Sequence, residues 1–498
     1  MKKFITFAGV SMLATVAFAS VSPKIDTSND RVKMKLAVPY SQLGVLTPKD
    51  ASKVQKNFTI GCETLDRGYA DYDAYKEYLA PLGVKTIRIQ GGWAKTEKVK
   101  GVYDFAWLDK IISDARSRGL EVWLQLSYGN PIYKGAGTPY LKSPMPSSKE
   151  GKKAWDKWVG AMAKRYAGKV SWEVWNEPDL DKSVLAKDIA DLNARTSSII
   201  LKADPKAEIA GLSVAEINPK RFANYIDSLK KTGKLKNFKW LTYHAYRTRP
   251  EESYTWIGMT EQKLKEVSTK VVLRMGEGGV PSEGGPDGRE WTGPVTVTTV
   301  SNSSLSGHPW TEISQAKWIL RRVLGDLARG YDSNAGSIAD MNYAPVDEIK
   351  KKSTKGLLAT NDKNQVVKIK LAYYAVQNLA SVFDLFDKRI GSQSISAEYP
   401  EQIETNGYID NETGKAVFTI WQCDTIPTNI CFTTPVDVEI KGAGKFENPV
   451  WVDIFTGKVC EIPADKITRD GDVLKVKDFP IYDSPVLVTD KSVLNFKK

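Results

Sequence analysis

Two glutamates in this chain each follow a short, mostly apolar segment of the kind that forms a buried strand. Glu177 lies near the end of Trp-Glu-Val-Trp-Asn-Glu-Pro (residues 172–178), and Glu277 lies between two glycines after residues 271–275. A glycosidic bond is cleaved by such a pair: one acid protonates the leaving oxygen, and the other carboxylate attacks or activates water. We therefore expect glycosidic-bond chemistry if the fold brings Glu177 and Glu277 to opposite sides of one cleft.

Glu173 belongs to the same motif, but its expected direction differs. Side chains alternate along a strand, which places Glu173 on the face opposite to Asn176. We interpret Glu173 as a salt-bridged or solvated surface residue. Asn176, beside Glu177, suits a hydrogen bond to a sugar 2-hydroxyl that strengthens in the transition state.

The elements around these residues follow a regular cadence from about residue 58 to residue 384. Candidate strands begin near residues 58, 84, 120, 170, 207, 238, 270 and 336, with the eighth at 337–339, and amphipathic helices are expected at 73–82, 105–118, 149–166 and 313–327. Eight strands, each followed by a helix, predict a (β/α)₈ TIM barrel of the α/β class, whose active site lies at the carboxyl ends of the strands. A doubly wound sheet is the rival fold, but no glycine-rich phosphate motif opens its first turn.

The pattern changes after the barrel. Residues 385–498 contain short strand-like segments, such as 415–421, 436–440, 450–454 and 486–488, separated by turn residues. They predict an all-β accessory domain, most simply a β-sandwich. Residues 20–57 form an N-terminal segment that could pack against either domain.

The charge and the N-terminus restrict the class of partner. Apolar residues make up 42% of the 498 residues and charged residues 26%, which excludes a disordered chain, and the formal net charge is +12. Residues 1–19 have a basic start, an apolar stretch and an Ala-Phe-Ala end, which predict a signal peptide and export to the periplasm or the medium. We expect no nucleic-acid partner for an exported protein and no integral membrane segment, and the sequence leaves the oligomeric state open.

The few cysteines and histidines point to neither a metal nor a cofactor. The two histidines, His244 and His308, are far apart in the sequence, no Cys-x-x-Cys occurs, and no cofactor motif is present. Cys423 and Cys431 could form a disulfide in an oxidising compartment, with Cys460 as the competing partner.

The motif at 172–178 resembles the acid/base motif of clan A glycoside hydrolases, particularly family 39 and its relatives. Further resemblance follows in barrel order and covers most of residues 58–345: Thr-Ile-Arg-Ile-Gln (86–90), Tyr-Gly-Asn-Pro (128–131) and the His-x-Tyr pattern at 244–246. The C-terminal β domain also resembles the accessory sandwich of these enzymes. The resemblance implies that Glu177 is the general acid/base and Glu277 the nucleophile of a retaining mechanism.

The resemblance implies further roles around this pair. Arg88 would hold Glu277 ionised, although a plain structural ion pair is an equal reading. Tyr246 would donate to Glu277 and orient it. His244 would bind a sugar hydroxyl, with a satisfied core histidine as the alternative. Glu63 would line the sugar subsite or belong to an ion-pair network at the rim.

Aromatic residues in loops near the strand ends are candidates for sugar stacking. Trp93, Tyr128 and Trp310 lie in such loops, and the long loop at 278–311 is expected to be a lid or a subsite wall. One feature departs from the clan: many members place a tryptophan at the end of the eighth strand, whereas Asp-Met-Asn-Tyr (340–343) follows here. The identity of the sugar therefore cannot be transferred from the clan.

The sequence supports three readings of function. The first is an exported retaining glycoside hydrolase acting on β-linked oligo- or polysaccharides. The second is a non-catalytic carbohydrate-binding protein on the same barrel, and the third is transglycosylation by the same two glutamates. The sugar, the linkage and the choice between exo and endo action are left open by the sequence.

Overall fold

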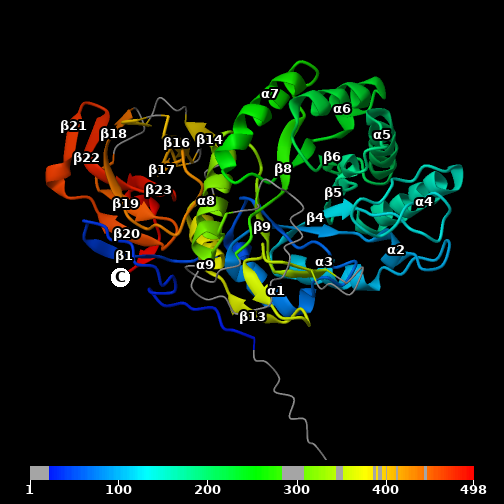
Figure 1. Cartoon of the computed structure of the whole chain (residues 1–498), viewed down its shortest axis with the longest axis horizontal. Coiled ribbons are helices and arrows are strands. Elements are labelled where there is room, and N and C mark those ends of the chain that lie inside the picture. Colours follow the sequence, from blue (N-terminus) through cyan, green and yellow to red (C-terminus); the bar gives the residue numbers. More distant parts are fainter. Residues whose placement is uncertain are drawn as a thin grey trace, which may run out of the picture.

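The computed structural model describes residues 22–282, 305, 308–343, 351–384, 388–390, 395–399, 401–410, 413–441 and 446–498. The expected signal peptide and most of the loop at 278–311 lie outside these residues. The described part contains a barrel and a separate set of antiparallel sheets, which confirms the predicted fold class (Figure 1).

The barrel sheet has eight parallel strands within the described residues, in the order β8-β7-β6-β5-β4-β3-β2-β9. Each strand is short and mostly buried, as expected where helices cover a parallel sheet. Their bounds are β2 Thr59–Gly61, β3 Thr86–Gln90, β4 Glu121–Leu126, β5 Ser171–Val174, β6 Ile209–Val214, β7 Trp240–Ala245, β8 Val272–Gly278 and β9 Asn334–Ser337.

The barrel closes between β8 and β9 through a single parallel bridge. Arg274 pairs with Asp332, and the Met275 N–H donates to the Asp332 carbonyl at 3.0 Å. The eighth strand begins before the predicted position at 337–339. Residues 338 and 339 are buried, but Ala339 forms an isolated bridge with Leu358, so their apolar character reflects burial outside the strand.

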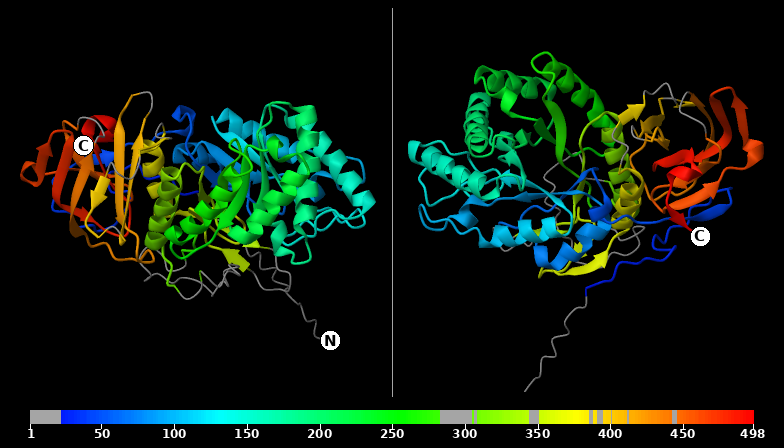
Figure 2. Two further views of the ribbon diagram at one scale, coloured as in Figure 1. Left: turned by 90° about the horizontal axis from the view of Figure 1, so that it is seen from above. Right: turned by 180° about the vertical axis from the view of Figure 1, so that it is seen from behind.

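Helices follow the barrel strands and surround the sheet (Figure 2). Their bounds are α1 Tyr72–Leu82, α2 Trp93–Thr96, α3 Ala106–Ser117, α4 Lys149–Tyr166, α5 Ala186–Ala203, α6 Pro219–Lys231, α7 Tyr254–Lys265, α8 Glu312–Ala328 and α9 Leu371–Val382. The four predicted helices coincide with α1, α3, α4 and α8 to within one residue at each end. Local capping explains such agreement: the Ser148 hydroxyl accepts from the Gly151 N–H at 2.9 Å at the start of α4.

Two small antiparallel hairpins lie between β9 and α9. The first pairs β10 (Met341–Tyr343) with β11 (Lys351–Ser353), and the second pairs β12 (Leu358–Thr360) with β13 (Val366–Ile369).

The C-terminal domain consists of two antiparallel sheets. One has the order β14-β16-β17-β23-β19-β20-β1-β24, and the other has the order β15-β18-β22-β21. The bounds are β1 Gln42–Leu46, β14 Lys388–Ile390, β15 Ile395–Ala397, β16 Ile403–Ile409, β17 Ala416–Gln422, β18 Thr434–Lys441, β19 Pro449–Asp453, β20 Lys458–Glu461, β21 Ile467–Asp470, β22 Val473–Ile481, β23 Val486–Asp490 and β24 Phe496–Lys497. The N-terminal segment thus contributes β1 to the C-terminal sheet, where it pairs with β20 and β24.

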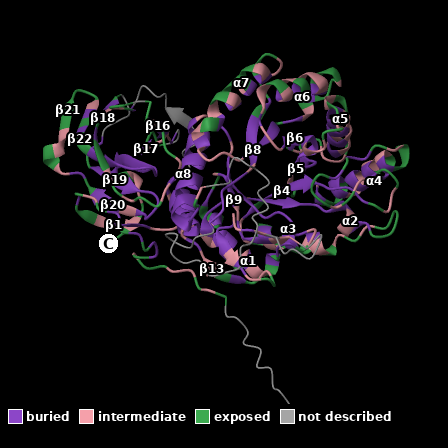
Figure 3. Cartoon of the chain, in the orientation of Figure 1, coloured by how far each residue is buried: buried purple, intermediate pink, exposed green. Residues whose placement is uncertain are grey.

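Helix α8 lies between the barrel and the C-terminal sheets, and it is buried along almost its whole length (Figure 3). Its polar side chains are buried with it and find partners on both sides. Arg321 forms an ion pair with Glu251 at 2.7 Å and donates to the Thr425 carbonyl at 3.0 Å, and Lys317 contacts Asp483 at 2.5 Å. Charged residues of α8 therefore join the two domains.

Two further expectations concern covalent and membrane features. All four cysteines are free thiols, so the structure contains neither pairing considered for Cys423. Among the described residues, no helix combines the length and apolar character needed to cross a membrane.

Candidate active site

A cavity of about 320 Å³ lies at the carboxyl ends of the barrel strands. It has the position at which TIM barrels place their active sites. Seven of the ten residues predicted to form the site line it: Glu63, Tyr128, Asn176, Glu177, His244, Tyr246 and Glu277. Arg88 lies directly behind the lining and contacts several of them.

Glu177 reaches the cavity through a strained turn at the end of β5. Trp175 and Glu177 both have positive φ values, 62° and 49°. Such conformations are costly for residues other than glycine and persist only where the surroundings hold them. The Glu177 N–H donates to the Ser213 carbonyl at 2.7 Å, and Pro178 starts a short 3₁₀ helix immediately afterwards. The turn directs Glu177 toward the cleft.

Glu277 emerges from β8 on the other side of the cavity and is held as a carboxylate. Arg88 donates to its Oε1 at 2.6 Å, and the Tyr246 hydroxyl donates to its Oε2 at 3.1 Å. Burial alone would raise the pKa of Glu277, but the charges of His244 and Arg88 and these hydrogen bonds outweigh burial and lower it to about 2.

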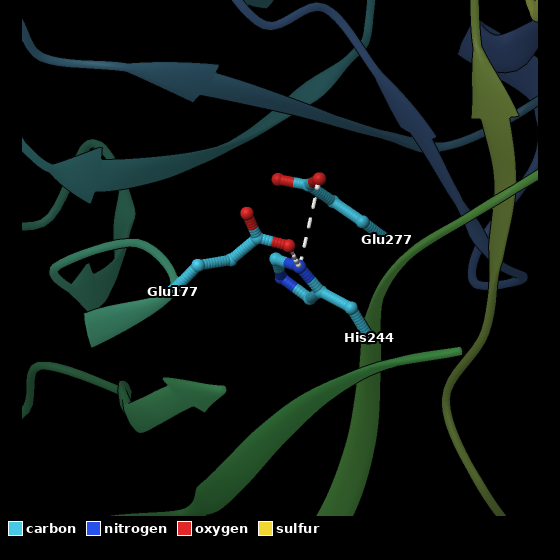
Figure 4. A group of neighbouring side chains, drawn as sticks. All are labelled: Glu177, His244 and Glu277. Atoms are coloured by element: carbon cyan, nitrogen blue, oxygen red, sulfur yellow. Dashed lines mark hydrogen bonds and ion pairs between the residues drawn. The ribbon is translucent and has the colours of Figure 1, made fainter. Parts of the chain in front are cut away.

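His244 on β7 lies beside both carboxylates (Figure 4). Its Nδ1 is 2.7 Å from Glu177 Oε1 and 3.6 Å from Glu277 Oε2. Burial would lower the pKa of His244, but the charge of Glu277 and the hydrogen bond to Glu177 raise it above its usual value. One proton joins the two groups: an ionised Glu177 accepts it from Nδ1–H, and a protonated Glu177 donates it to Nδ1.

Arg88, fully buried on β3, connects the polar residues around the cavity. Its guanidinium contacts Glu63 at 3.0 Å and Glu173 at 2.7 Å in addition to Glu277, and it donates to Asn176 Oδ1 at 3.1 Å. Burial raises the pKa of Glu63 to about 7, although Arg88 acts in the opposite direction. The arrangement combines the two roles that the sequence left open for Glu63, because it both lines the cavity and pairs with Arg88.

Glu173 forms a salt bridge with Arg88, as the sequence interpretation allowed, but its placement at the surface was wrong. Glu173 is fully buried inside the barrel, where it accepts hydrogen bonds from Arg88, Gln125 and Thr242. The polar residues of β3, β4 and β7 occur at alternate positions, which is the signal that places them on one face. Glu173 and Asn176 both contact Arg88 because the chain turns after Val174 and the strand alternation ends there.

Asn176 and Tyr128 form the part of the site next to Glu177. Asn176 Nδ2 donates to the Tyr128 hydroxyl at 2.6 Å, and Asn176 Oδ1 accepts from Gln125 Nε2 at 2.9 Å. The Arg67 guanidinium lies 4.8 Å from the centre of the Tyr128 ring. Arg67 also lines the cavity.

The structure contradicts the proposed sugar contacts of Trp93 and Trp310. Trp93 is fully buried and stacks against Tyr133 and Trp158, and its Nε1 donates to Glu97 at 2.6 Å. Trp310 is also buried, and its Nε1 donates to the Leu305 carbonyl at 3.0 Å. Both side chains belong to the core: Trp93 packs against Trp155 and Trp158 of α4, and Trp310 lies just before α8.

Glu177, His244 and Glu277 are also the residues that could hold a divalent cation. Each offers a ligand atom, and these atoms lie within 4.8 Å of one another. Their existing partners explain the arrangement without an ion, because His244 is hydrogen-bonded to Glu177 and Arg88 compensates the charge of Glu277. The geometry therefore provides one carboxylate held ionised and a second one across the cleft from it.

Comparison with known families agrees with this geometry. The family model described as cellulase (glycosyl hydrolase family 5) matches residues 52–282, which carry both glutamates. The chain resembles the clan A glycoside hydrolases. This match confirms the resemblance inferred from the motif at 172–178 and supports a glycosidase function. A sequence search of curated proteins gave no match.

Solved structures with the same architecture include other glycosidases. A family 39 glycoside hydrolase from Bacteroides cellulosilyticus WH2 has a TM-score of 0.60 and 16% identity, over 90% of this chain and 83% of that chain. A monomeric β-xylosidase from Caulobacter crescentus CB15 has a TM-score of 0.54 and 15% identity, over 91% and 98%. A GH30 endoxylanase from Clostridium papyrosolvens C71 has a TM-score of 0.55 and 12% identity, over 91% and 98%. At these identities the similarity establishes the fold.

Proposed function

We propose that this protein is an exported, retaining glycoside hydrolase that cleaves β-linked oligo- or polysaccharides. One observation carries the proposal: Glu277 is held ionised by Arg88 and Tyr246, while Glu177 lies across the cavity with His244 between the two. Opposed environments for two carboxylates are what acid and nucleophile assignments require. A retaining pair is separated by about 5–5.5 Å, and the 4.8 Å limit on the ligand atoms of the cluster agrees with that class.

The reaction has two displacement steps. In the first, Glu277 attacks the anomeric carbon, the bond from that carbon to the leaving oxygen breaks, and Glu177 gives its proton to the leaving oxygen. In the second, Glu177 takes a proton from water, the water oxygen attacks the anomeric carbon, and the ester bond to Glu277 breaks. Each step inverts the anomeric centre, so the product retains the starting configuration.

The surroundings of the pair fit this sequence. Tyr246 and Arg88 keep Glu277 deprotonated before attack, and His244 fixes the orientation of Glu177. Asn176 lies next to Glu177, held by Arg88, Gln125 and Tyr128, at a position suited to a sugar hydroxyl. The cavity, at about 320 Å³ as the described residues line it, is near the lower end of ligand pockets, about 300–1,000 Å³, which favours short saccharides or chain ends.

The decisive test replaces Glu277 by alanine and measures hydrolysis of a panel of aryl β-glycosides and β-linked polysaccharides. We expect the variant to lose turnover by several orders of magnitude and to regain part of it with azide, which can occupy the space left by the carboxylate. Glu121→Ala, at an exposed position on β4, is the control and should keep wild-type turnover. Full activity of the Glu277 variant would disprove the nucleophile assignment.

Two further measurements separate the alternatives. Proton NMR of the first-formed anomer should show retention, and net inversion would contradict double displacement. Glu177→Ala should keep activity on aryl glycosides with good leaving groups, which need no proton, and lose it on alkyl glycosides. No product from any wild-type reaction, together with saccharide binding, would favour the non-catalytic alternative, and formation of longer saccharides would indicate transglycosylation.

A further inference from the structure

The hairpin β10–β11 forms one wall of the cavity. Met341, Tyr343 and Ser353 of this hairpin line the cavity, and so does Lys355 in the segment that follows it. The wall therefore places one basic side chain, that of Lys355, at the cavity.

Lys355 differs from the other basic residues that line the cavity. Four of these have protein partners: Arg67 pairs with Asp66 at 3.2 Å, Arg221 and Arg247 pair with Glu216 at 2.8 and 2.7 Å, and Lys182 donates to the Asp179 carbonyl at 3.2 Å. Lys142 lies exposed at the rim. Within the part of the chain that the structure describes, the Lys355 ammonium has no hydrogen bond or ion pair.

The ammonium of Lys355 lies 4.0 Å from the centre of the Tyr246 ring. The Tyr246 hydroxyl donates to Glu277. The Lys355 ammonium and the proposed nucleophile therefore contact the same tyrosine. A lysine that served only as a counter-ion would be expected to reach a carboxylate, as Arg88 does at 2.6 Å from Glu277. The side chain of Lys355 is partly buried and lines the cavity, and an ammonium offers three N–H donors to a ligand there.

We propose that Lys355 is a subsite for an anionic group on the sugar next to the scissile bond, either a uronic acid carboxylate or a sulfate ester. The inference rests on the proposed glycosidase function and specifies its substrate class. A neutral sugar bound there would bury the ammonium without giving it a strong hydrogen-bond acceptor. Such an uncompensated buried charge is costly. An anionic group would supply a short, charge-assisted hydrogen bond in that space.

The electrostatics of the wall agree with this assignment. Burial lowers the pKa of Lys355 to about 8, although the carboxylates of Glu277, Glu177 and Glu63 act in the opposite direction. Lys355 is therefore charged at neutral pH and gradually loses its charge above about pH 8. A bound anion would favour the charged form, so preference for anionic sugars should decline above that pH.

The test compares each enzyme variant on matched substrates, so that effects common to all substrates cancel. The kcat/KM for p-nitrophenyl β-glucuronide and for a 6-sulfated p-nitrophenyl β-glucoside is divided by that for the neutral β-glucoside. In Lys355→Met we expect the ratio for the recognised anion to fall about tenfold to a hundredfold, the value of a charge-assisted hydrogen bond. The substrate whose ratio falls identifies the anion.

Lys352→Met is the matched control. Lys352 is three residues earlier, but its ammonium binds the Thr360 carbonyl, and the residue does not line the cavity. Its ratios should equal those of the wild type. Unchanged ratios in Lys355→Met would overturn the proposal, and so would an equal loss on all three substrates, which would show a general electrostatic role.

Calorimetric binding of glucuronate, glucose 6-sulfate and glucose needs no turnover and separates this proposal from the proposed function. Selective binding of one anion by the wild type, lost in Lys355→Met, supports the subsite even if no substrate is cleaved. Hydrolysis of neutral glycosides without any preference for an anion would leave the glycosidase function standing and refute the subsite.

Discussion

At the scale of single residues, the chemistry depends on charge environments that differ among the carboxylates around Arg88. Glu277 has its pKa lowered to about 2 from an ordinary value of 4.5, whereas that of Glu63 is raised to about 7. Both side chains contact the same guanidinium. Burial raises the pKa of both carboxyl groups. For Glu277 the charges of His244 and Arg88 and the hydrogen bonds from Arg88 and Tyr246 outweigh burial, whereas for Glu63 burial and the charge of Glu277 outweigh Arg88.

The low pKa of Glu277 makes a prediction for stability against pH. A carboxylate with a depressed pKa stabilises the fold above its unfolded pKa, and this contribution is lost as the pH falls from about 4.5 to about 2. The shift corresponds to about 3 kcal/mol. The free energy of unfolding of the wild type minus that of Glu277→Gln, measured by urea titration at several pH values, should therefore decrease by about that amount across this range. A difference that is independent of pH would contradict the ionised assignment.

Glu173 is predicted to be a positioning residue. It accepts from Arg88, Gln125 and Thr242, and so fixes the guanidinium that holds Glu277. Glu173→Gln keeps the size of the side chain but removes the charge, so Arg88 should lose its fixed orientation. We expect kcat to fall about tenfold, the equivalent of 1.4 kcal/mol, with a smaller change in KM.

Steady-state kinetics and a pH profile check the prediction for Glu173. If Glu173 has a purely structural role, the variant loses stability, but the low-pH limb of the pH dependence of kcat does not move. If Glu173 positions Arg88, that limb shifts and kcat falls with it. Glu121→Gln, an exposed change on the neighbouring strand, should leave both unchanged. Wild-type kcat and an unmoved acid limb in Glu173→Gln would refute the positioning role.

At the scale of elements, β7 and β8 must approach closely for His244 to reach both carboxylates. Gly276 on β8 allows this approach: a Cβ there would lie 3.1 Å from both Cδ2 and Nε2 of the His244 ring. Gly276→Ala should displace the imidazole by a few tenths of an ångström and lower kcat several-fold. Gly258→Ala on α7, where a Cβ meets no atom within 4 Å, should leave kcat unchanged and stabilise the helix by up to about 1 kcal/mol. Equal kinetics for the two variants would show that the strand contact does not position His244.

The elements that the sequence predicted well are those specified by local pattern. Strand starts and helix bounds followed from periodicity and caps, as at Ser148. The placement of β1 could not be predicted, because its partners β20 and β24 lie more than 400 residues away in the sequence. Trp93 has the composition of a sugar platform, and its burial depends on α4 packing against it, which no local pattern reveals.

The candidate site shows the same limit. The two glutamates and His244 follow apolar strand patterns and could be found. Lys355 could not, because it lies just after the hairpin β10–β11, whose pairing no local pattern reveals, and its ammonium contacts Tyr246 from a distant part of the sequence.

At the scale of the whole molecule, the two domains are joined through a buried polar interface. Helix α8 supplies Lys317 and Arg321 to the C-terminal domain, and the N-terminal segment adds β1 to its main sheet (Figure 1). Asp483 also accepts from the Thr428 N–H at 2.8 Å. These contacts connect helix α8 of the barrel to the loop before β23. We therefore expect the barrel and the C-terminal domain to unfold together.

The ion pair between Lys317 and Asp483 provides the test of this coupling. The side chain of Lys317 is 0% exposed and that of Asp483 is 8% exposed, and removing one partner of a buried pair typically costs about 3–5 kcal/mol because the other charge stays unpaired. Lys317→Ala should lower the free energy of unfolding by that amount and shift the whole calorimetric transition to lower temperature. Lys100→Ala breaks a pair whose side chains are 53% and 51% exposed, and it should change stability by less than about 1 kcal/mol. If Lys317→Ala lowers only one of two resolved transitions, the domains unfold independently, because a shared interface must carry the loss to both.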